Sequence, residues 1–478
     1  MKPSFLATMS DRELQKIHQT SLTILEDVGL LIDHPGARSV LHDAGARVDD
    51  GGRVKFPAAL VEACLAKVPK SVCLAGRDPE YDLMLSYDSP FAVRCATGQT
   101  AILEPDAQSC RDATTVDQRN LATLADAQEN LAMAGPLTLH DVPGKTADLH
   151  ATSILLQCQR KHFMNLTMGP KNMRCQIEMQ LAVRGSREEM KKRPLFHPIA
   201  CLISPLYIPE NDIEIMMIAG EYGLPLKVPV MPMLGASSPV TLAGMLALGN
   251  AEVLGSISVL QTLCPGTPTI YYLVPALMDM RSGGSVYAGP ESSLLYASII
   301  QMARFFYKVP SDTTGLFCDG ILPEQVTCQK GANLQAAALA GANILGGAGN
   351  VDGGMAFSPR QLVIDNELIG LTRRFLEGFA VDETSLALDC IRRVGPRGNF
   401  LEDRHTFENF RSQALFSPKI FNYQNFSAWR QDPRQIAERA QEKAEAVLRS
   451  HEVPPLDDHV VKELNKLVRS ADADIAGV

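Results

Sequence analysis

From about residue 112 onward, short apolar segments alternate with amphipathic helical patterns, and this alternation constrains the fold more than any other feature. Short apolar runs flanked by helices are typical of parallel β-strands that are buried on both faces. Helices are expected at 116–130, 149–159, 211–222, 240–262, 292–307 and 331–339. The expected strands are 131–139, 163–168, 199–204, 226–233, 269–274, 313–318 and 342–345.

Seven or eight such units over roughly 250 residues fit a closed (β/α)8 barrel better than an open sheet. We therefore expect an α/β fold of the TIM-barrel type, with the barrel over residues 112–375. Residues 1–111 are expected to form an N-terminal extension of helices and strands, which begins with a capping box at Ser10 and Glu13. Residues 376–478 are expected to form a mainly helical C-terminal extension packed on the barrel.

The composition narrows the class of protein. Hydrophobic residues make up 46% of the chain but aromatic residues only 6%, so the core is expected to be mostly aliphatic and any aromatic cluster becomes informative. A formal charge of −9 argues against nucleic-acid binding, which usually needs a basic face. The apolar stretch 224–280 is interrupted by Pro, Gly, Asn and Glu, so no membrane span is expected.

The cysteine pattern and the N-terminus point to the cytoplasm. The eleven cysteines contain no CxxC pair and no spacing typical of a secreted disulfide framework, so we expect reduced thiols. The first residues turn polar at Ser10 and show no signal-peptide pattern. No His lies near a second His or a Cys at ligand spacing, so no bound metal is expected.

A glycine-rich segment, Gly346–Gly354, follows an expected strand and precedes an expected helix. Its spacing does not match GxGxxG and it comes late in the chain, so no bound nucleotide is expected. Its backbone N–H groups near a helix start could instead hold a carboxylate or a phosphate. A tight turn that needs glycine dihedral angles is the alternative.

Two loops at expected strand ends carry candidate catalytic and binding residues, because such ends form the active site of a barrel enzyme. Asp319 and Glu324 are the catalytic candidates, with hydrogen bonding to loop backbone as the alternative role. The polar connection 278–291 offers Arg281 for a substrate anion and Tyr287 for a cation, unless Arg281 pairs with Asp279 inside the loop.

Several stretches resemble a known family when they are taken in order. They are 236–244 (Ala-Ser-Ser-Pro-Val-Thr-Leu-Ala-Gly), 275–283, 338–343, 358–367 and 394–401. Together they resemble the trimethylamine methyltransferase family, the corrinoid-dependent amine methyltransferases, from about residue 10 to 440. The resemblance implies a (β/α)8 barrel, a methylated amine as methyl donor, and a cognate corrinoid (cobalamin) protein as acceptor.

The founding trimethylamine enzymes of that family carry pyrrolysine, whereas this chain reads through with ordinary residues near Ile321. It thus resembles the pyrrolysine-free branch, the glycine betaine:corrinoid methyltransferases. A quaternary amine needs no acid, because its leaving group is a neutral tertiary amine. We expect glycine betaine or a related betaine as donor. The alternatives are trimethylamine, carnitine or proline betaine, or a barrel that binds betaine without catalysis.

Such a donor needs a place for each of its charged ends. The ammonium is expected among aromatic faces, each contributing about 0.5–2 kcal/mol, and the candidates are Tyr271, Tyr272, Tyr287, Phe317 and Phe357. Strand alternation lets only one of the two adjacent tyrosines point inward. A carboxylate would bind Arg281 or the loop residues Gly346, Gly349 and Asn350.

Two departures from the family pattern leave the substrate open. Relatives often have His where this chain has Gly346. Many of them have Asp-Ala-Lys and Asp-x-Gln-Ala-Gly after the strand that ends at Asp319, where this chain has Asp-Gly-Ile-Leu-Pro-Glu-Gln over 319–325. The sequence pattern does not decide whether the chain forms a homo-oligomer.

Overall fold

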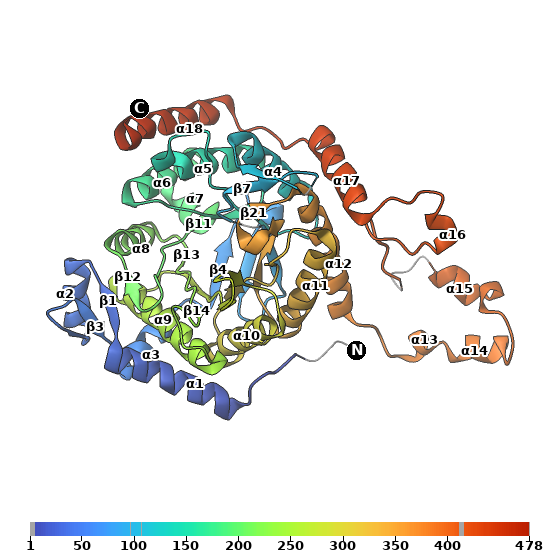
Figure 1. Cartoon of the computed structure of the whole chain (residues 1–478), viewed down its shortest axis with the longest axis horizontal. Helices are drawn as coiled ribbons and strands as arrows, with labels where there is room; N and C mark the ends of the chain where they lie inside the picture. The colour runs from blue at the N-terminus through green and yellow to red at the C-terminus, as the bar shows by residue number, and fades with distance from the viewer. Residues whose placement is uncertain (1–4, 96, 107, 411–414, 478) are drawn as a thin grey trace.

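The computed structural model describes residues 5–95, 97–106, 108–410 and 415–477, and its centre is an eight-stranded parallel barrel (Figure 1). Consecutive strands pair in chain order, the last pairs with the first, and a bridge between Ile199 and Lys227 closes the remaining seam. The predicted (β/α)8 barrel is confirmed. Its strands are β6 (Ala92–Cys95), β9 (Met133–Ala134), β10 (His162–Asn165), β11 (Phe196–Pro198), β13 (Leu226–Lys227), β15 (Thr269–Tyr272), β18 (Ser311–Thr313) and β19 (Ile344–Ala348).

One long helix follows each strand and covers the outside of the barrel (Figure 1). The short α7 (Arg187–Lys192) is an addition between α6 and β11. Most expected helices and strands are found within a few residues of their predicted positions. The covering helices are α4 (Thr115–Ala127), α5 (Ala147–Cys158), α6 (Pro170–Arg184), α8 (Glu210–Tyr222), α9 (Leu242–Leu263), α10 (Pro290–Gln301), α11 (Pro323–Leu339) and α12 (Pro359–Glu377).

The first barrel strand, β6, lies within residues 1–111, where the sequence pattern indicated only an extension. The barrel therefore begins at Ala92 rather than near residue 112. β6 has only four residues, and a hairpin of β7 (Ala101–Leu103) and β8 (Cys110–Asp112) separates it from α4. The strand-then-helix alternation is consequently not visible in this part of the sequence.

The rest of the N-terminal segment packs against the barrel. The hairpin of β4 (Ser71–Leu74) and β5 (Leu83–Ser86) closes the end at which the barrel strands begin, where Val72, Leu74 and Leu85 contact Ala92 and Ile344. Ser10 and Glu13 form the expected capping box. The helices α1 (Asp11–Thr23), α2 (Pro35–Asp43) and α3 (Ala58–Lys67) pack on α9, and one sheet contains β1 (Leu30–Ile32), β2 (Arg47–Val48), β3 (Arg53–Lys55) and β12 (Tyr207–Ile208).

Helix α9 is the one helix in the described part of the chain that is long and apolar enough to cross a membrane. In the fold, 83% of that apolar window is buried, because α1, α3, α8 and α10 pack around it. Its apolar composition is that of a helix buried on most sides within a protein core.

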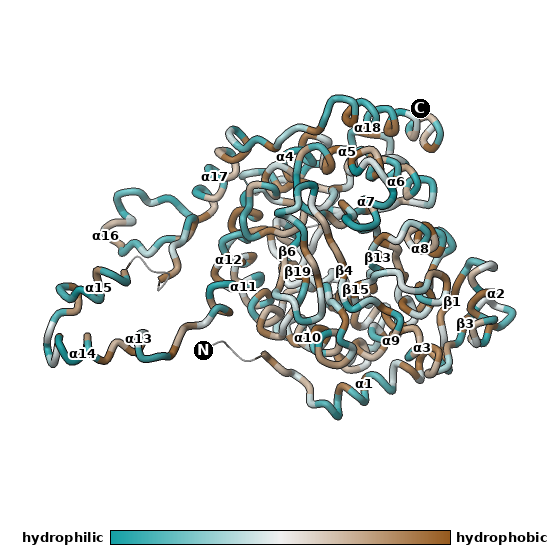
Figure 2. Tube along the Cα trace, turned by 180° about the vertical axis from the view of Figure 1, so that it is seen from behind, coloured by the Kyte–Doolittle hydropathy of each residue, from teal (hydrophilic) through white to brown (hydrophobic). Residues whose placement is uncertain are grey.

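One part of the C-terminal segment packs on the barrel, and another part extends away from it. Helix α17 (Ile436–Ser450) packs on α12 and α4. Helix α18 (Asp458–Ala471) packs on α5 and α6. Between α12 and α17 the chain extends away from the barrel, as both whole-chain views show (Figures 1 and 2). This part contains α13 (Glu383–Leu386), α14 (Leu388–Val394), α15 (Arg404–Asn409) and α16 (Phe426–Trp429).

Candidate active site

The end of the barrel at which the strands end holds a cluster of aromatic and apolar side chains. Tyr272 ends β15, Tyr287 comes from the connection that follows it, and Phe317 comes from the loop after β18. The Tyr287 and Phe317 rings meet edge to face, with 5.2 Å between their centroids. Three of the five aromatic candidates therefore lie together, and we call Tyr272, Tyr287 and Phe317 the aromatic cluster.

The other two aromatic candidates lie elsewhere. Tyr271 points out of the barrel, stacks on Tyr307, and donates its hydroxyl hydrogen to Asn250 Oδ1 at 2.7 Å. Phe357, in β21 (Ala356–Phe357), is fully buried in the main hydrophobic core against Gly349. Alternation along β15 places one tyrosine on each side of the sheet, and only Tyr272 reaches the interior.

Directly beside Tyr272, three charged side chains meet inside the barrel: Arg94 of β6, Lys227 of β13 and Asp312 of β18. Asp312 Oδ2 accepts hydrogen bonds from Arg94 Nε at 3.0 Å and from Lys227 Nζ at 2.5 Å. Arg94 Nη2 also donates to the Tyr272 hydroxyl oxygen at 2.6 Å. The three side chains are at most 2% exposed. We call Arg94, Lys227 and Asp312 the charged layer.

The charged layer holds two cationic groups and one carboxylate, so it carries a surplus positive charge when Lys227 is protonated. Burial lowers the pKa of Lys227 to about 8, against the opposing effect of Asp312. Asp312 Oδ1 has no hydrogen-bond partner among the described residues. Buried charges are stable only when they are paired and hydrogen-bonded. An additional anion would balance the surplus positive charge of Arg94 and Lys227.

Gly346 makes room for the charged layer. A Cβ atom at this position would lie 2.2 Å from Arg94 Cζ and 2.3 Å from Arg94 Nη2, so only glycine admits the guanidinium in its present place. Gly346 belongs to β19 and pairs with Arg94 across the sheet. Its role is therefore to leave space within the barrel, whereas the sequence had suggested a ligand-binding loop.

The other loop candidates are already engaged or buried. The Gly349 N–H donates to Asp365 Oδ2 at 2.7 Å, and Lys330 Nζ donates to the same oxygen at 2.6 Å. Asn350, in β20 (Asn350–Val351), is fully buried, and its Nδ2 has no partner among the described residues. Of the three glycine-loop candidates, only Gly346 borders the charged layer.

The two predicted catalytic carboxylates differ in their surroundings. Asp319 accepts the backbone N–H groups of Tyr287 at 2.6 Å and of Ala288 at 3.0 Å, and burial raises its pKa. It thus holds the loop that carries the Tyr287 ring, which is the alternative role foreseen for it. Glu324 is exposed in the first turn of α11. Arg281 is also exposed, and its backbone N–H donates to Asp279 Oδ1 at 3.1 Å.

Two histidines that the sequence analysis did not single out meet beside the charged layer. His162 Nδ1 lies 3.0 Å from the Ala75 carbonyl oxygen and must carry a hydrogen to bond it. His162 Nε2 then accepts from His197 Nδ1 at 2.8 Å, which leaves His197 Nε2 as a buried acceptor with no partner among the described residues. Burial lowers the pKa of His162 to about 3 and that of His197 well below its usual value. Both rings are therefore neutral.

Sequence reasoning missed Arg94, Lys227 and Asp312, although each left a signal. Each is a single charged residue within a short strand of otherwise uncharged residues. A charge in a strand that is buried on both faces is unfavourable unless it is paired. Each of these residues therefore needs a partner of opposite charge inside the fold. Only the closed barrel shows that the three partners are one another.

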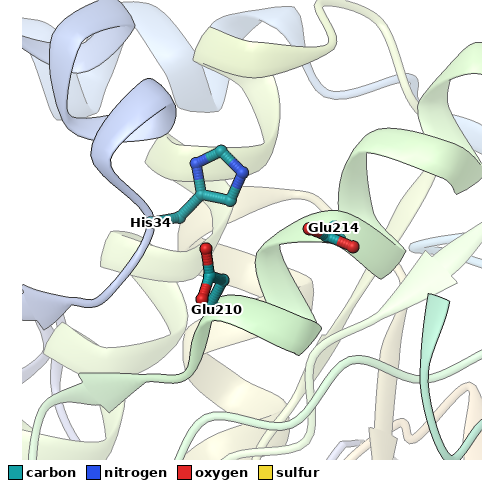
Figure 3. A group of neighbouring side chains, drawn as sticks. All are labelled: His34, Glu210 and Glu214. Carbon is teal, nitrogen blue, oxygen red and sulfur yellow. The ribbon is translucent and has the colours of Figure 1, made fainter.

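A second polar cluster lies outside the barrel, where His34 approaches Glu210 and Glu214 of α8 (Figure 3). Their possible ligand atoms lie within 4.8 Å of one another. However, His34 Nδ1 accepts the Ala37 N–H at 2.9 Å and caps α2. The ring hydrogen of the neutral imidazole is then on Nε2, so neither nitrogen offers a metal a free lone pair. Helix capping accounts for this histidine.

Comparison with known proteins connects this geometry to a family. The family model described as trimethylamine methyltransferase matches residues 2–476. The chain is 30% identical to trimethylamine methyltransferase MttB of Desulfitobacterium hafniense over 98% of this chain and 94% of that protein. It is 32% identical to trimethylamine methyltransferase MttB1 of Methanosarcina mazei, over 98% and 95% of the two chains. A glycine betaine methyltransferase of Desulfitobacterium hafniense is 29% identical, over 98% and 97%.

Solved structures agree on the fold. The monomethylamine methyltransferase of Methanosarcina barkeri superimposes with a TM-score of 0.52 over 98% of this chain and 96% of that chain, at 12% sequence identity. This similarity supports the barrel architecture, while the sequence matches carry the assignment of the family. The chain is an enzyme of the methyltransferase class and belongs to the trimethylamine methyltransferase family.

Proposed function

We propose that this enzyme transfers a methyl group from a quaternary amine that bears a carboxylate, glycine betaine or a related betaine, to the Co(I) corrinoid of a partner protein. The observation that carries this proposal is the contact between the aromatic cluster and the charged layer through Tyr272. Its ring belongs to the aromatic cluster, its hydroxyl oxygen accepts from Arg94, and Lys227 Nζ lies 5.4 Å from its ring centroid. A betaine has one charged end for each set of residues.

The charges decide how such a substrate is oriented. Aromatic faces attract an ammonium group, and the edge-to-face pair of Tyr287 and Phe317 offers them at the end of the barrel where the strands end. Arg94 and Lys227 would repel a lone cation by about 4 kcal/mol at 4 Å, for an effective dielectric constant of 20. A carboxylate next to these two residues turns that repulsion into attraction, so a zwitterion is favoured over choline or another simple cation.

The arrangement suits chemistry that needs no acid. Loss of a methyl group from a quaternary nitrogen leaves a neutral tertiary amine, so the departing group takes up no proton. Asp319, the one catalytic candidate beside the aromatic cluster, already accepts two backbone N–H groups. The residues of this chain would then hold the N–methyl bond in line with the acceptor, a contribution that comes from positioning. The corrinoid is a co-substrate, and its Co(I) supplies the nucleophile.

The rim of the barrel fits an acceptor that arrives on another protein. Six of the loops that follow barrel strands each expose an apolar side chain, and four of these are flexible methionines. Exposed apolar surface of this kind marks interaction sites. The six residues are Met168, Ile203, Met231, Met280, Leu322 and Met355. The eleven cysteines are all free, which supports the cytoplasm as the compartment.

Transfer to free cob(I)alamin tests the proposal. Glycine betaine is expected to discharge the cob(I)alamin absorbance, while choline, which has the same ammonium but no carboxylate, is not. Transfer from trimethylamine but not from any betaine would replace the proposed donor. Binding of betaine without transfer from any quaternary amine would instead favour the non-catalytic alternative.

A further inference from the structure

Residues 380–410 form an arm that extends from the barrel (Figures 1 and 2), and several of its large apolar side chains are exposed. Seven large apolar side chains of the arm are between 51% and 82% exposed: Val381, Leu386, Leu388, Ile391, Leu401, Phe407 and Phe410. Among its described residues, Cys390 is the only buried hydrophobic one. Soluble monomers rarely expose apolar side chains in such density.

The arm nevertheless has a defined local structure. Asp403 accepts the His405 N–H at 2.8 Å, which caps α15, and pairs with Arg393 Nη2 at 2.9 Å. Asp382 accepts the Ser385 N–H at 2.8 Å and caps α13. Helices of four to seven residues are not stable in isolation, because one turn does not offset the cost of nucleation. The arm therefore needs another surface to cover its apolar side chains.

A groove of about 740 Å³ lies where the arm begins. Its lining is largely apolar and includes Phe5, Leu83, Phe91, Ala342 and Leu376. Leu376 is in the last turn of α12, immediately before the chain leaves the barrel. Phe91 and Ala342 precede β6 and β19, so the groove is at the end of the barrel where strands begin, opposite the aromatic cluster.

We propose that the arm packs into this groove on a second copy of the chain. The arm of the second copy packs into the groove of the first. An apolar arm and an apolar groove that adjoin in one chain are self-complementary, and two copies related by a two-fold axis satisfy both at once. The corrinoid partner does not fit this role, because it must reach the substrate at the opposite end of the barrel. The assembly leaves both active sites open.

The mass of the full chain in solution tests the proposal, by light scattering coupled to size exclusion at micromolar concentration. The wild type is expected at twice the 51.9 kDa chain mass, or at a higher even multiple. The arm variant Leu401→Asp/Phe407→Asp and the groove variant Phe5→Asp are each expected to halve that mass. The matched control Val240→Asp/Met280→Asp, with similarly exposed residues on the opposite rim, is expected to keep it.

Two variants on different surfaces separate loss of assembly from loss of folding. The arm and groove variants are expected to retain the far-ultraviolet circular dichroism of the wild type and methyl transfer to free cob(I)alamin. A monomeric wild type, or a groove variant with unchanged mass, would overturn the proposal. This outcome does not depend on which amine is the substrate.

Discussion

The guanidinium of Arg94 occupies the space that a side chain at residue 346 would fill: a Cβ there would come within 2.2 Å of Arg94 Cζ. The backbone at Gly346 needs no left-handed conformation, and the three atoms nearest to a Cβ at that position all belong to Arg94. The two residues therefore form one unit, in which glycine is retained because arginine is present.

This relationship predicts a coupling between substitutions. Gly346→Ala is expected to lower the free energy of unfolding by about 2 kcal/mol, because Arg94 is surrounded by packed strands and has little room to shift. In the Arg94→Met background the same substitution is expected to have a much smaller effect, since a thinner, flexible side chain can move aside. Chemical denaturation of the four proteins measures the coupling. Equal effects in both backgrounds would mean that Gly346 has another role.

Lys227 is expected to select for the carboxylate of the substrate. Lys227→Met leaves Arg94 paired with Asp312 and removes the surplus positive charge. Affinity for glycine betaine is expected to fall about 10- to 100-fold, the range for loss of a charged hydrogen bond. Calorimetry measures this binding, and choline serves as the control ligand, because its affinity should not fall. Parallel losses for both ligands would indicate damage to the whole site.

Binding of the carboxylate should also depend on pH. Burial lowers the pKa of Lys227 to about 8, so the free enzyme loses this positive charge as the pH rises through that value. Glycine betaine is therefore expected to bind more weakly above pH 8 than at pH 7, while Arg94 remains charged. Lys227→Met should remove the dependence. A flat profile for the wild-type enzyme would contradict a role for Lys227 in binding.

The aromatic cluster is expected to recognise positive charge as well as shape. Phe317→Ala or Tyr287→Ala should weaken glycine betaine binding by about 2- to 30-fold, which corresponds to 0.5–2 kcal/mol. The isostere 3,3-dimethylbutyrate, in which an uncharged carbon replaces the ammonium nitrogen and the carboxylate is kept, should lose less affinity. Tyr271→Phe is a useful control, because that ring lies outside the barrel. Equal losses for the two ligands would argue that only apolar contact matters.

Glu252 offers a prediction about stability. Its carboxylate is buried in α9, accepts the Leu206 N–H and the Ser204 hydroxyl at 2.8 Å each, and has a pKa that burial raises to about 7. A carboxyl group whose pKa is raised on folding stabilises the fold at low pH, and this contribution disappears as pH rises from about 4.5 to 7. Glu252→Gln should therefore stabilise the protein at pH 8, by about 1–3 kcal/mol. Thermal unfolding at pH 5 and 8 tests this, and a larger gain at pH 5 would contradict it.

The strand-and-helix periodicity was sufficient to predict the barrel, because strands buried on both faces need apolar residues throughout and their covering helices need one apolar stripe. It failed at β6, whose four residues have no helix immediately after them. It also did not predict the arm, because short helices that bury little against their own chain have weak periodicity.

The residues of the candidate site also fall into two groups, those that the sequence pattern predicted and those that only the tertiary structure revealed. The sequence by itself determined the class of fold, the family, and the presence of Tyr272, Tyr287 and Phe317 near strand ends. Only the tertiary structure decided that Arg94, Lys227 and Asp312, more than 80 residues apart in the chain, share one buried carboxylate oxygen. Side-chain periodicity reports which face of a strand is inward, but the closure of the barrel decides which inward residues meet. Gly346 has no side chain whose position a sequence pattern could predict. The need for glycine there arises because Arg94 lies against it in the folded barrel.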